Sequence, residues 1–190
     1  MASNVEIANR ALQKLGAKRI VSLTEDSRNG RAVNAAFEVL KEAELRKHPW
    51  NFAVKRASLA ASATAPLFTK SNSFPLPSDF LRLLAPDEED NTNYRDWQIE
   101  GRSIVTNDDA PLEIRYVSNV DDPNEMDVLF REALSMKIAE ELAEELTQSN
   151  QKKAEAVQAY MQKIGEARRA NAFERVSQSQ PEDVWITVRD

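Results

Sequence analysis

Apolar residues recur at intervals of three and four along residues 4–15 and again along residues 27–47. This spacing places them on one face of a helix, and it predicts two amphipathic helices near the start of the chain. The residues expected at the helix ends are Ser3 with Glu6 as a capping box, Gly16 as a stop, Asp26 or Ser27 as the second N-cap, and Pro49 as the second stop.

Helical spacing is lost from residue 51 to residue 118, where short stretches alternate apolar and polar residues. Alternation of period two indicates strands, whereas the prolines with Ser, Thr and Asn in 63–79 indicate an extended connection. We therefore expect a small, mostly antiparallel β unit of three to five strands. The stretches expected to form strands are 51–62, 79–86, 94–105 with a turn at Glu100–Gly101, and 111–118.

Two long helices are predicted over residues 123–147 and 150–174, with Asp122 as N-cap and Pro123 at the first helical position. The apolar arc of the first is too wide for a helix that touches only one neighbour. Its members are Leu129, Ala133, Leu134, Met136, Ile138, Ala139, Leu142, Ala143 and Leu146. The stripe of the second consists of Val157, Tyr160, Met161, Ile164 and Ala167.

The order of these elements predicts an α+β fold. We expect a mainly α-helical bundle of four helices, with a small antiparallel β subdomain inserted between helices 2 and 3 and an extended C-terminal tail. The expected domains are the helical bundle at 1–50 and 119–176, the β subdomain at 51–118, and a docking tail at 177–190.

The composition excludes several classes of chemistry. The 190 residues include no cysteine, which rules out disulfides, thiolate zinc sites and thiol nucleophiles. A single histidine, His48, and four isolated glycines leave no basis for a His-rich metal site or a phosphate-binding glycine loop. We therefore expect no enzyme activity, metal or cofactor. The polar N-terminus and the lack of an apolar run of ~20 residues predict a cytoplasmic product without a membrane span.

The net charge of −6 is unevenly distributed. Residues 1–60 carry 11 Lys and Arg against 6 Asp and Glu, residues 61–120 carry 5 against 10, and residues 121–190 carry 9 against 15. A basic front with an acidic remainder is typical either of a nucleic-acid surface or of complementary packing. We favour packing, within the chain or between copies, because the basic residues are not interleaved with aromatic ones.

Three polar features have structural interpretations. His48 is expected to act structurally at a helix end, where it complements the helix dipole. The acidic clusters 87–90 and 108–109 lack the spaced ligands and glycine of a calcium loop, so we expect solvated loops. The glutamates expected to face solvent or an aqueous channel are Glu140, Glu141, Glu144 and Glu145.

The C-terminal tail has a different character. Residues 177–181 are polar and end in a proline, which indicates a tether, and an apolar segment with Trp185 follows them. An aromatic residue at such a place usually has something to bind, and packing on the chain's own core is the alternative. The residues expected to bind a partner are Val184, Trp185, Ile186, Val188 and Arg189.

Four stretches, together with the final DVWITVRD, resemble one family in their order along the chain. They are NRALQKLGAKRIVSLTEDS (9–27), LRKHPWNFAVKRASLA (45–60), the pair FPLPSDFLRLL (74–84) with WQIEGRSIVTNDDAPLEIRYVS (97–118), and residues 126–174. The resemblance is to the tail tubular protein A family, the head-to-tail adaptors of short-tailed phages and related prophages. It covers nearly the whole chain.

The resemblance implies a structural protein of the virion neck, made in the host bacterial cytoplasm. Such adaptors form a ring, typically of twelve copies, between the portal protein and the tail nozzle of tail tubular protein B type. Double-stranded DNA is retained behind this neck and ejected through it without sequence-specific binding. The charge split would let like subunits meet head to tail. The interface candidates are Arg10, Lys14, Arg28 and Arg31.

Two other classes of function stay open at this point. A cytoplasmic regulator would bind nucleic acid through the basic N-terminal helices, and its DNA binding would depend on salt. A glycan hydrolase would need a pair of carboxylates in a cleft, which sequence alone does not place.

Overall fold

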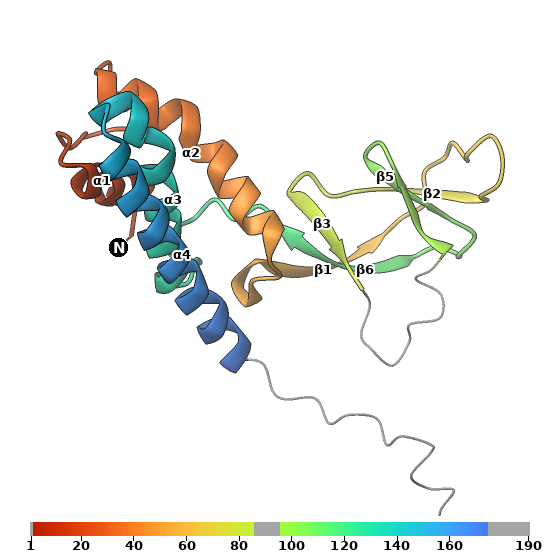
Figure 1. Cartoon of the computed structure of the whole chain (residues 1–190). Coiled ribbons are helices and arrows are strands. Elements are labelled where there is room, and N and C mark those ends of the chain that lie inside the picture. Colours follow the sequence, from red (N-terminus) through yellow and green to blue (C-terminus); the bar gives the residue numbers. More distant parts are fainter. Residues whose placement is uncertain (1, 86–95, 175–190) are drawn as a thin grey trace, which may run out of the picture.

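The computed structural model describes residues 2–85 and 96–174 of the chain. They form four helices and two small antiparallel sheets of three strands each, so the expected mixed α+β class is confirmed. The helices gather on one side of the molecule and the strands on the other (Figure 1). We call these parts the helical lobe and the β lobe. No helix in the described ranges is long and apolar enough to cross a membrane.

The first two helices begin and end where the sequence predicts. They are α1 (Asn4–Leu15) and α2 (Arg28–Lys47). Ser3 and Glu6 form the capping box, and Gly16 ends α1 in the left-handed conformation with φ of 73°. The Ser27 hydroxyl accepts the Gly30 N–H and caps α2, which ends at His48 before Pro49.

Two glycines in helices are expected to respond oppositely to alanine. A Cβ on Gly30 would meet the Glu25 carbonyl oxygen at 2.3 Å, whereas the nearest atom to a Cβ on Gly165 is Arg169 Nη2 at 4.0 Å. We expect Gly165→Ala to raise the free energy of unfolding by about 0.5–1 kcal/mol, because alanine favours the helix. Gly30→Ala should lower it by about 1–3 kcal/mol, because backbone must move. Chemical denaturation measures both, and a shift of the same sign in the two variants would contradict this packing.

The third helix begins later than expected. α3 spans Val128–Thr147, and its N-cap is Asp127 rather than Asp122. The Asp127 carboxylate accepts the N–H groups of Leu129 and Phe130 at 2.8 and 3.2 Å. Asp122 instead accepts the backbone N–H of Asn124 at 2.9 Å within a preceding turn. Both aspartates satisfy the same local preference, and Asp127 lies where the backbone turns into the helix.

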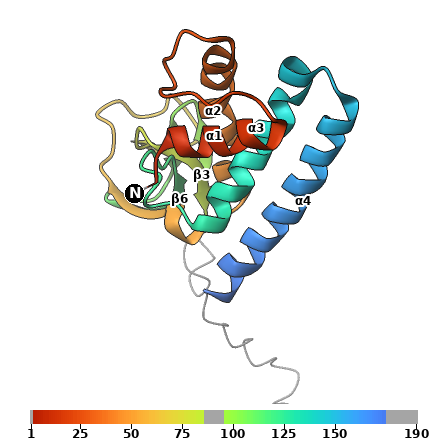
Figure 2. The same ribbon diagram turned by 90° about the vertical axis from the view of Figure 1, so that its left-hand side faces the viewer.

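The wide apolar arc of α3 is buried within the subunit. α3 packs against α1, α2 and α4 (Asn150–Phe173), and Figure 2 shows α1 lying across it with α4 alongside. One expectation for α4 is wrong, because Met161 is 64% exposed. The buried face of α4 follows Ala156, Tyr160, Ile164, Ala167 and Asn171 instead.

The β lobe contains six strands, more than the three to five expected. One sheet has the order β1-β6-β3, and the other has the order β2-β5-β4. One strand, β2, lies inside the stretch 63–79 that was expected to be only an extended connection, and it forms through pairing with β5. Residues 51–53, expected to begin the first strand, form a 3₁₀ turn before it. The expected turn at Gly101 is present, with φ of 58°. The strands are β1 (Val54–Leu59), β2 (Asn72–Pro75), β3 (Phe80–Leu84), β4 (Gln98–Glu100), β5 (Ser103–Thr106) and β6 (Leu112–Ser118).

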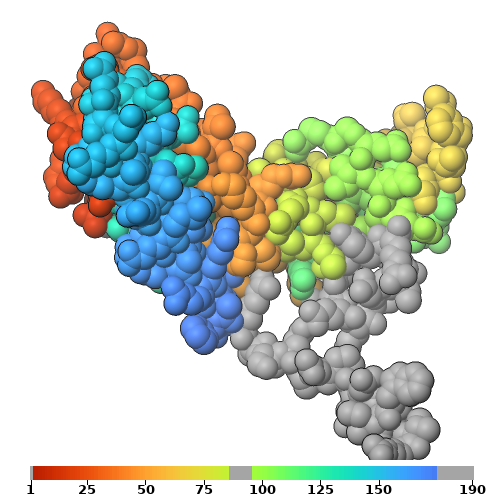
Figure 3. Space-filling model, in the orientation of Figure 1, coloured from red at the N-terminus to blue at the C-terminus, as the bar shows by residue number. Residues whose placement is uncertain are grey.

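Each lobe has its own apolar core. The β-lobe core gathers around Phe74, Ile104 and Tyr116, and the larger core fills the helical lobe. The chain passes between the lobes beside Trp50, whose ring centroid lies 4.9 Å from that of Phe130. On the outside, a notch separates α2 from the β lobe (Figure 3).

Candidate functional site

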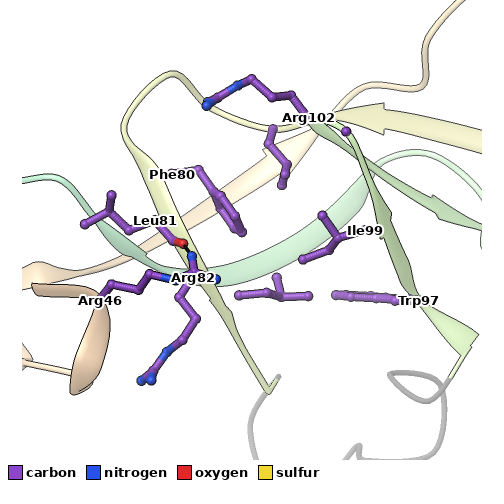
Figure 4. A pocket seen from close by; sticks show the side chains of 10 residues that line it. Arg46, Phe80, Leu81, Arg82, Trp97, Ile99 and Arg102 are labelled. Atoms are coloured by element: carbon purple, nitrogen blue, oxygen red, sulfur yellow. Dashed lines mark hydrogen bonds between the residues drawn. The ribbon is translucent and has the colours of Figure 1, made fainter. Parts of the chain in front are cut away.

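A hollow lies in the β lobe, between the strands β3 and β4. Its volume is about 680 Å³. Phe80, Leu81 and Leu83 of β3 line it together with Trp97 and Ile99 from the β4 side. Phe80 lies on the side of β3 that faces Ile99 and Trp97, whereas Leu81 lies on the opposite side, toward Arg46 (Figure 4). Among the described residues, β3 pairs only with β6 and β4 pairs only with β5, so both are edge strands. The site is therefore an apolar slot between two edge strands.

Three arginines surround this slot. Arg46 reaches from the end of α2 and donates to the Leu81 carbonyl oxygen. Arg82 donates to the Lys47 carbonyl oxygen at 3.4 Å, and Arg102 donates to the Pro77 carbonyl oxygen at 2.7 Å. These bonds to neutral carbonyl groups position the guanidinium groups without cancelling their charge. The slot thus combines an apolar floor with a cationic rim.

A second hollow of about 420 Å³ adjoins the slot in the notch beside α2. Both are lined by Arg46, Phe80, Leu81 and Arg102. The second extends past Asp79 to Val39, which is 68% exposed on α2. We refer to the two hollows together as the interlobe groove.

The chemistry of the slot is suited to binding. None of the described residues that line it carries a carboxylate or an imidazole. Within residues 2–85 and 96–174, no group of three or more His, Asp or Glu side chains is placed to hold a metal ion. An apolar floor with guanidinium groups around it fits an apolar peptide that carries acidic residues.

A polar cluster supports the β3 side of the groove. The Tyr116 hydroxyl donates to Asp79 at 3.0 Å, and the Lys55 ammonium donates to the same carboxylate at 2.8 Å. Burial raises the pKa of Tyr116 to about 12, and the Asp79 charge adds to the effect. The pKa of Asp79 lies below its ordinary value: burial would raise it, but the bonds from Lys55 and Tyr116 outweigh burial.

The raised pKa of Tyr116 predicts a loss of stability in alkali. Below pH 10, the ordinary tyrosine pKa, the residue is neutral in both states and its contribution is complete. Between pH 10 and about 12 the unfolded chain releases this proton while the folded chain retains it, so the free energy of unfolding falls. Tyr116→Phe should flatten this fall. Denaturation at several pH values measures it, and an unchanged alkaline slope in the variant would contradict the assignment.

The basic interface candidates are partly engaged within the chain. Arg10 pairs with Glu132 of α3 at 3.3 Å, and Arg28 donates to the Glu145 carbonyl oxygen. Arg31 pairs with Asp26 beside it. Lys14 lines a hollow between α1 and α4. Whether these residues also meet a neighbouring copy stays a prediction.

His48 occupies the structural position expected of it. It caps the end of α2, lies edge-on to Trp50 with ring centroids 4.7 Å apart, and has its Nε2 3.1 Å from Asn171 Nδ2. Asn171 also accepts the Asn51 N–H at 2.7 Å. The histidine therefore helps hold the end of α4 against the junction between the lobes.

Of the acidic candidates, Glu141, Glu144 and Glu145 are exposed as expected, whereas the Glu140 side chain is only 22% exposed. Asp108 accepts a hydrogen bond from the Trp97 indole, and Glu140 and Glu144 pair with Lys137 and Lys153 at 2.9 and 2.7 Å. The acidic loop at 87–90 lies outside the described residues. The expected partner-binding residues Val184, Trp185, Ile186, Val188 and Arg189 also lie outside them.

Comparison with protein-family models and with curated proteins gives no match for this chain. The sequence analysis did not find the interlobe groove, because its walls come from segments far apart in the chain. The one sequence feature that could have indicated the groove was Ile99, an apolar residue in a short strand that ends at a turn.

Proposed function

We propose that this chain is a head-to-tail adaptor subunit that forms a ring between a portal protein and a tail nozzle. The observation that carries the proposal is the ordered set of stretches resembling the tail tubular protein A family, because these stretches fold against one another. The elements from 9–27 pack on those from 126–174, and strands from 45–60 and 74–84 pair with β6.

In this proposal the chain is a four-helix bundle, residues 1–50 and 119–176, with a β subdomain inserted at 51–118. Residues 177–190 are the docking tail. The bundle gives the subunit a rigid body, and the β lobe projects from it as a separate element for contact (Figure 1). A subunit with two unlike ends favours head-to-tail contacts, which close into a ring when the rotation between copies allows it.

The charge distribution supports a passage for DNA rather than a DNA-binding surface. Glu141, Glu144 and Glu145 are exposed along α3. Such a face repels phosphates, so DNA would slide past it without binding. Among the basic residues, Arg10 and Arg31 are already paired with carboxylates of the same chain. This pairing weakens the case for the alternative, a nucleic-acid-binding regulator.

The test is electron microscopy of the purified chain mixed with the portal protein encoded by the same genome. We expect rings seated on the portal, and a free chain that remains monomeric, since each contact in such a ring is weak by itself. Salt-dependent binding of duplex DNA by the monomer, without any ring on the portal, would contradict the proposal and support the regulator.

Charge reversal tests whether the basic helices meet an acidic neighbour. The double variant Lys14→Glu/Arg31→Glu keeps the Arg10–Glu132 pair inside the subunit. We expect fewer rings from it than from wild type, and fewest at low salt, where like charges repel most strongly. Lys70→Glu in the β lobe, compared with Lys14→Glu alone, is the charge-matched control. Equal ring formation at every salt concentration would overturn the electrostatic account while leaving the adaptor role standing.

A further inference from the structure

The interlobe groove has apolar residues that the described chain leaves uncovered. Ile99 is 49% exposed on the edge strand β4, and Val39 is 68% exposed at the other end of the groove. The floor between them is formed by Phe80, Leu81 and Leu83. β3 and β4 are edge strands of their sheets, and an extended peptide can add to such an edge.

The charge of the groove selects among such peptides. Arg46, Arg82 and Arg102 lie around the slot, and their described hydrogen bonds go to neutral carbonyl groups. The carboxylates of Glu42 and Asp79 line the other end of the groove, beside Val39, so the cationic part is the slot between β3 and β4. A peptide with an apolar centre and acidic residues at its ends would complement this arrangement. Arginine also stacks on aromatic rings, so a tryptophan in the centre would gain a second contact.

The C-terminal sequence has this composition. Val184, Trp185, Ile186 and Val188 are strand-favouring residues. Glu182 and Asp183 precede them, and Asp190 ends the chain. We therefore propose, resting on the ring proposed above, that the groove of each copy receives the C-terminal segment 183–190 of a neighbouring copy.

The position of α4 makes this exchange feasible. The last turn of α4 is held at the junction between the lobes, where Asn171 accepts the Asn51 N–H and contacts His48. Arg46 of the groove lies two residues before His48. Copies in a ring share one orientation relative to its axis, so the end of α4 in each copy bears the same relation to the groove of the next copy. The eight residues 175–182 connect α4 to the segment and span up to roughly 26 Å when extended.

A peptide-binding experiment tests the fit between groove and segment. A fluorescein-labelled peptide of residues 181–190 is titrated into the full chain carrying Trp185→Ala, whose own tail lacks the aromatic anchor. We expect saturable binding that weakens with salt. Adding Ile99→Glu should weaken it at least about tenfold, because a carboxylate then faces the apolar peptide and its acidic ends. The control Val21→Glu alters an 87% exposed residue outside the groove and should leave binding unchanged. Absence of saturable binding, or equal binding by the Ile99→Glu chain, overturns the proposal.

A cross-linking experiment identifies the chain that supplies the segment. Full chains with a photo-reactive benzoylphenylalanine in place of Thr187 are mixed in ¹⁵N-labelled and unlabelled forms, above the dissociation constant of the peptide. We expect cross-links that join the two isotopic forms and lie within residues 80–83 or 97–102. Cross-links confined to chains of one isotopic form would mean that each tail occupies its own groove, and would overturn exchange between copies.

The two proposals fail separately. Rings on the portal without peptide binding would leave the adaptor role and remove the groove assignment. Peptide binding and mixed-isotope cross-links without rings on the portal would keep the groove and remove the adaptor role.

Discussion

Replacing Trp50 with alanine is expected to lower the free energy of unfolding by about 3–5 kcal/mol. The indole is 1% exposed at the junction between the lobes, and its ring centroid lies 4.9 Å from Phe130 and 6.1 Å from Phe52. Its Nε1 donates to the Glu44 carbonyl oxygen at 3.1 Å. Alanine would leave a large cavity and an unsatisfied carbonyl group, and the two losses add.

Urea denaturation followed by circular dichroism measures this loss. Phe173→Ala is the matched control, because Phe173 is an aromatic residue that is 87% exposed at the end of α4. The control should shift the free energy of unfolding by no more than about 0.5 kcal/mol. Equal effects of the two substitutions would mean that Trp50 does not join the lobes through packing.

Removing both carboxylates that face Lys41 is expected to lower the free energy of unfolding by about 2–4 kcal/mol. Lys41 is 1% exposed, and its ammonium lies 2.7 Å from Glu38 and 2.8 Å from Asp121. Burial would lower the pKa of Lys41, but the hydrogen bonds to Asp121 and Glu38 outweigh burial and raise it. In the variant Glu38→Gln/Asp121→Asn the buried Lys41 ammonium loses its charged partners. Burial then lowers the pKa of Lys41 without an opposing effect.

The matched substitution is Lys41→Met, which removes the charge and keeps the apolar stem. Because Glu38 and Asp121 are themselves largely exposed, we expect this variant to lie within about 1 kcal/mol of wild type. Combined with Glu38→Gln/Asp121→Asn, it should restore most of the lost stability. The loss in free energy of unfolding of the double variant should shrink as the pH rises toward 10.5. In that range Lys41 of the double variant binds more protons in the unfolded chain than in the folded chain, so rising pH favours the folded state. A deficit that persists in the triple variant would place its cause elsewhere.

The helices were predictable because their signals are local. Ser3, Glu6 and Gly16 each act within one helical turn, so the sequence alone places them correctly. For α2 the sequence left Asp26 and Ser27 as alternative N-caps, and the structure selects Ser27. The start of α3 was misplaced because two aspartates five residues apart have the same capping chemistry. Only the packing of the turn at 122–126 decides between them.

The strands and the groove depend on contacts between distant residues. β2 becomes a strand through its pairing with β5, about thirty residues away, and its own sequence with Phe74 and Pro75 is ambiguous. The groove is lined by residues from α2, β3 and β4, so no periodicity along the chain predicts it. Met161 was misassigned for a related reason, since an apolar residue at the margin of a helical stripe is buried only if a neighbouring helix reaches it.

The packing of α1 and α2 on α3 has a consequence for synthesis of the chain. α1 ends at Leu15, and the helix that covers its apolar face begins at Val128. While the chain is still emerging from the ribosome, both N-terminal helices therefore have uncovered apolar faces. The β lobe can fold at this stage, because its core residues all lie within 57–116. Until α3 and α4 have been synthesised, those faces are open to chaperones or to other nascent chains, so the helical lobe completes its packing only after residue 173 has emerged.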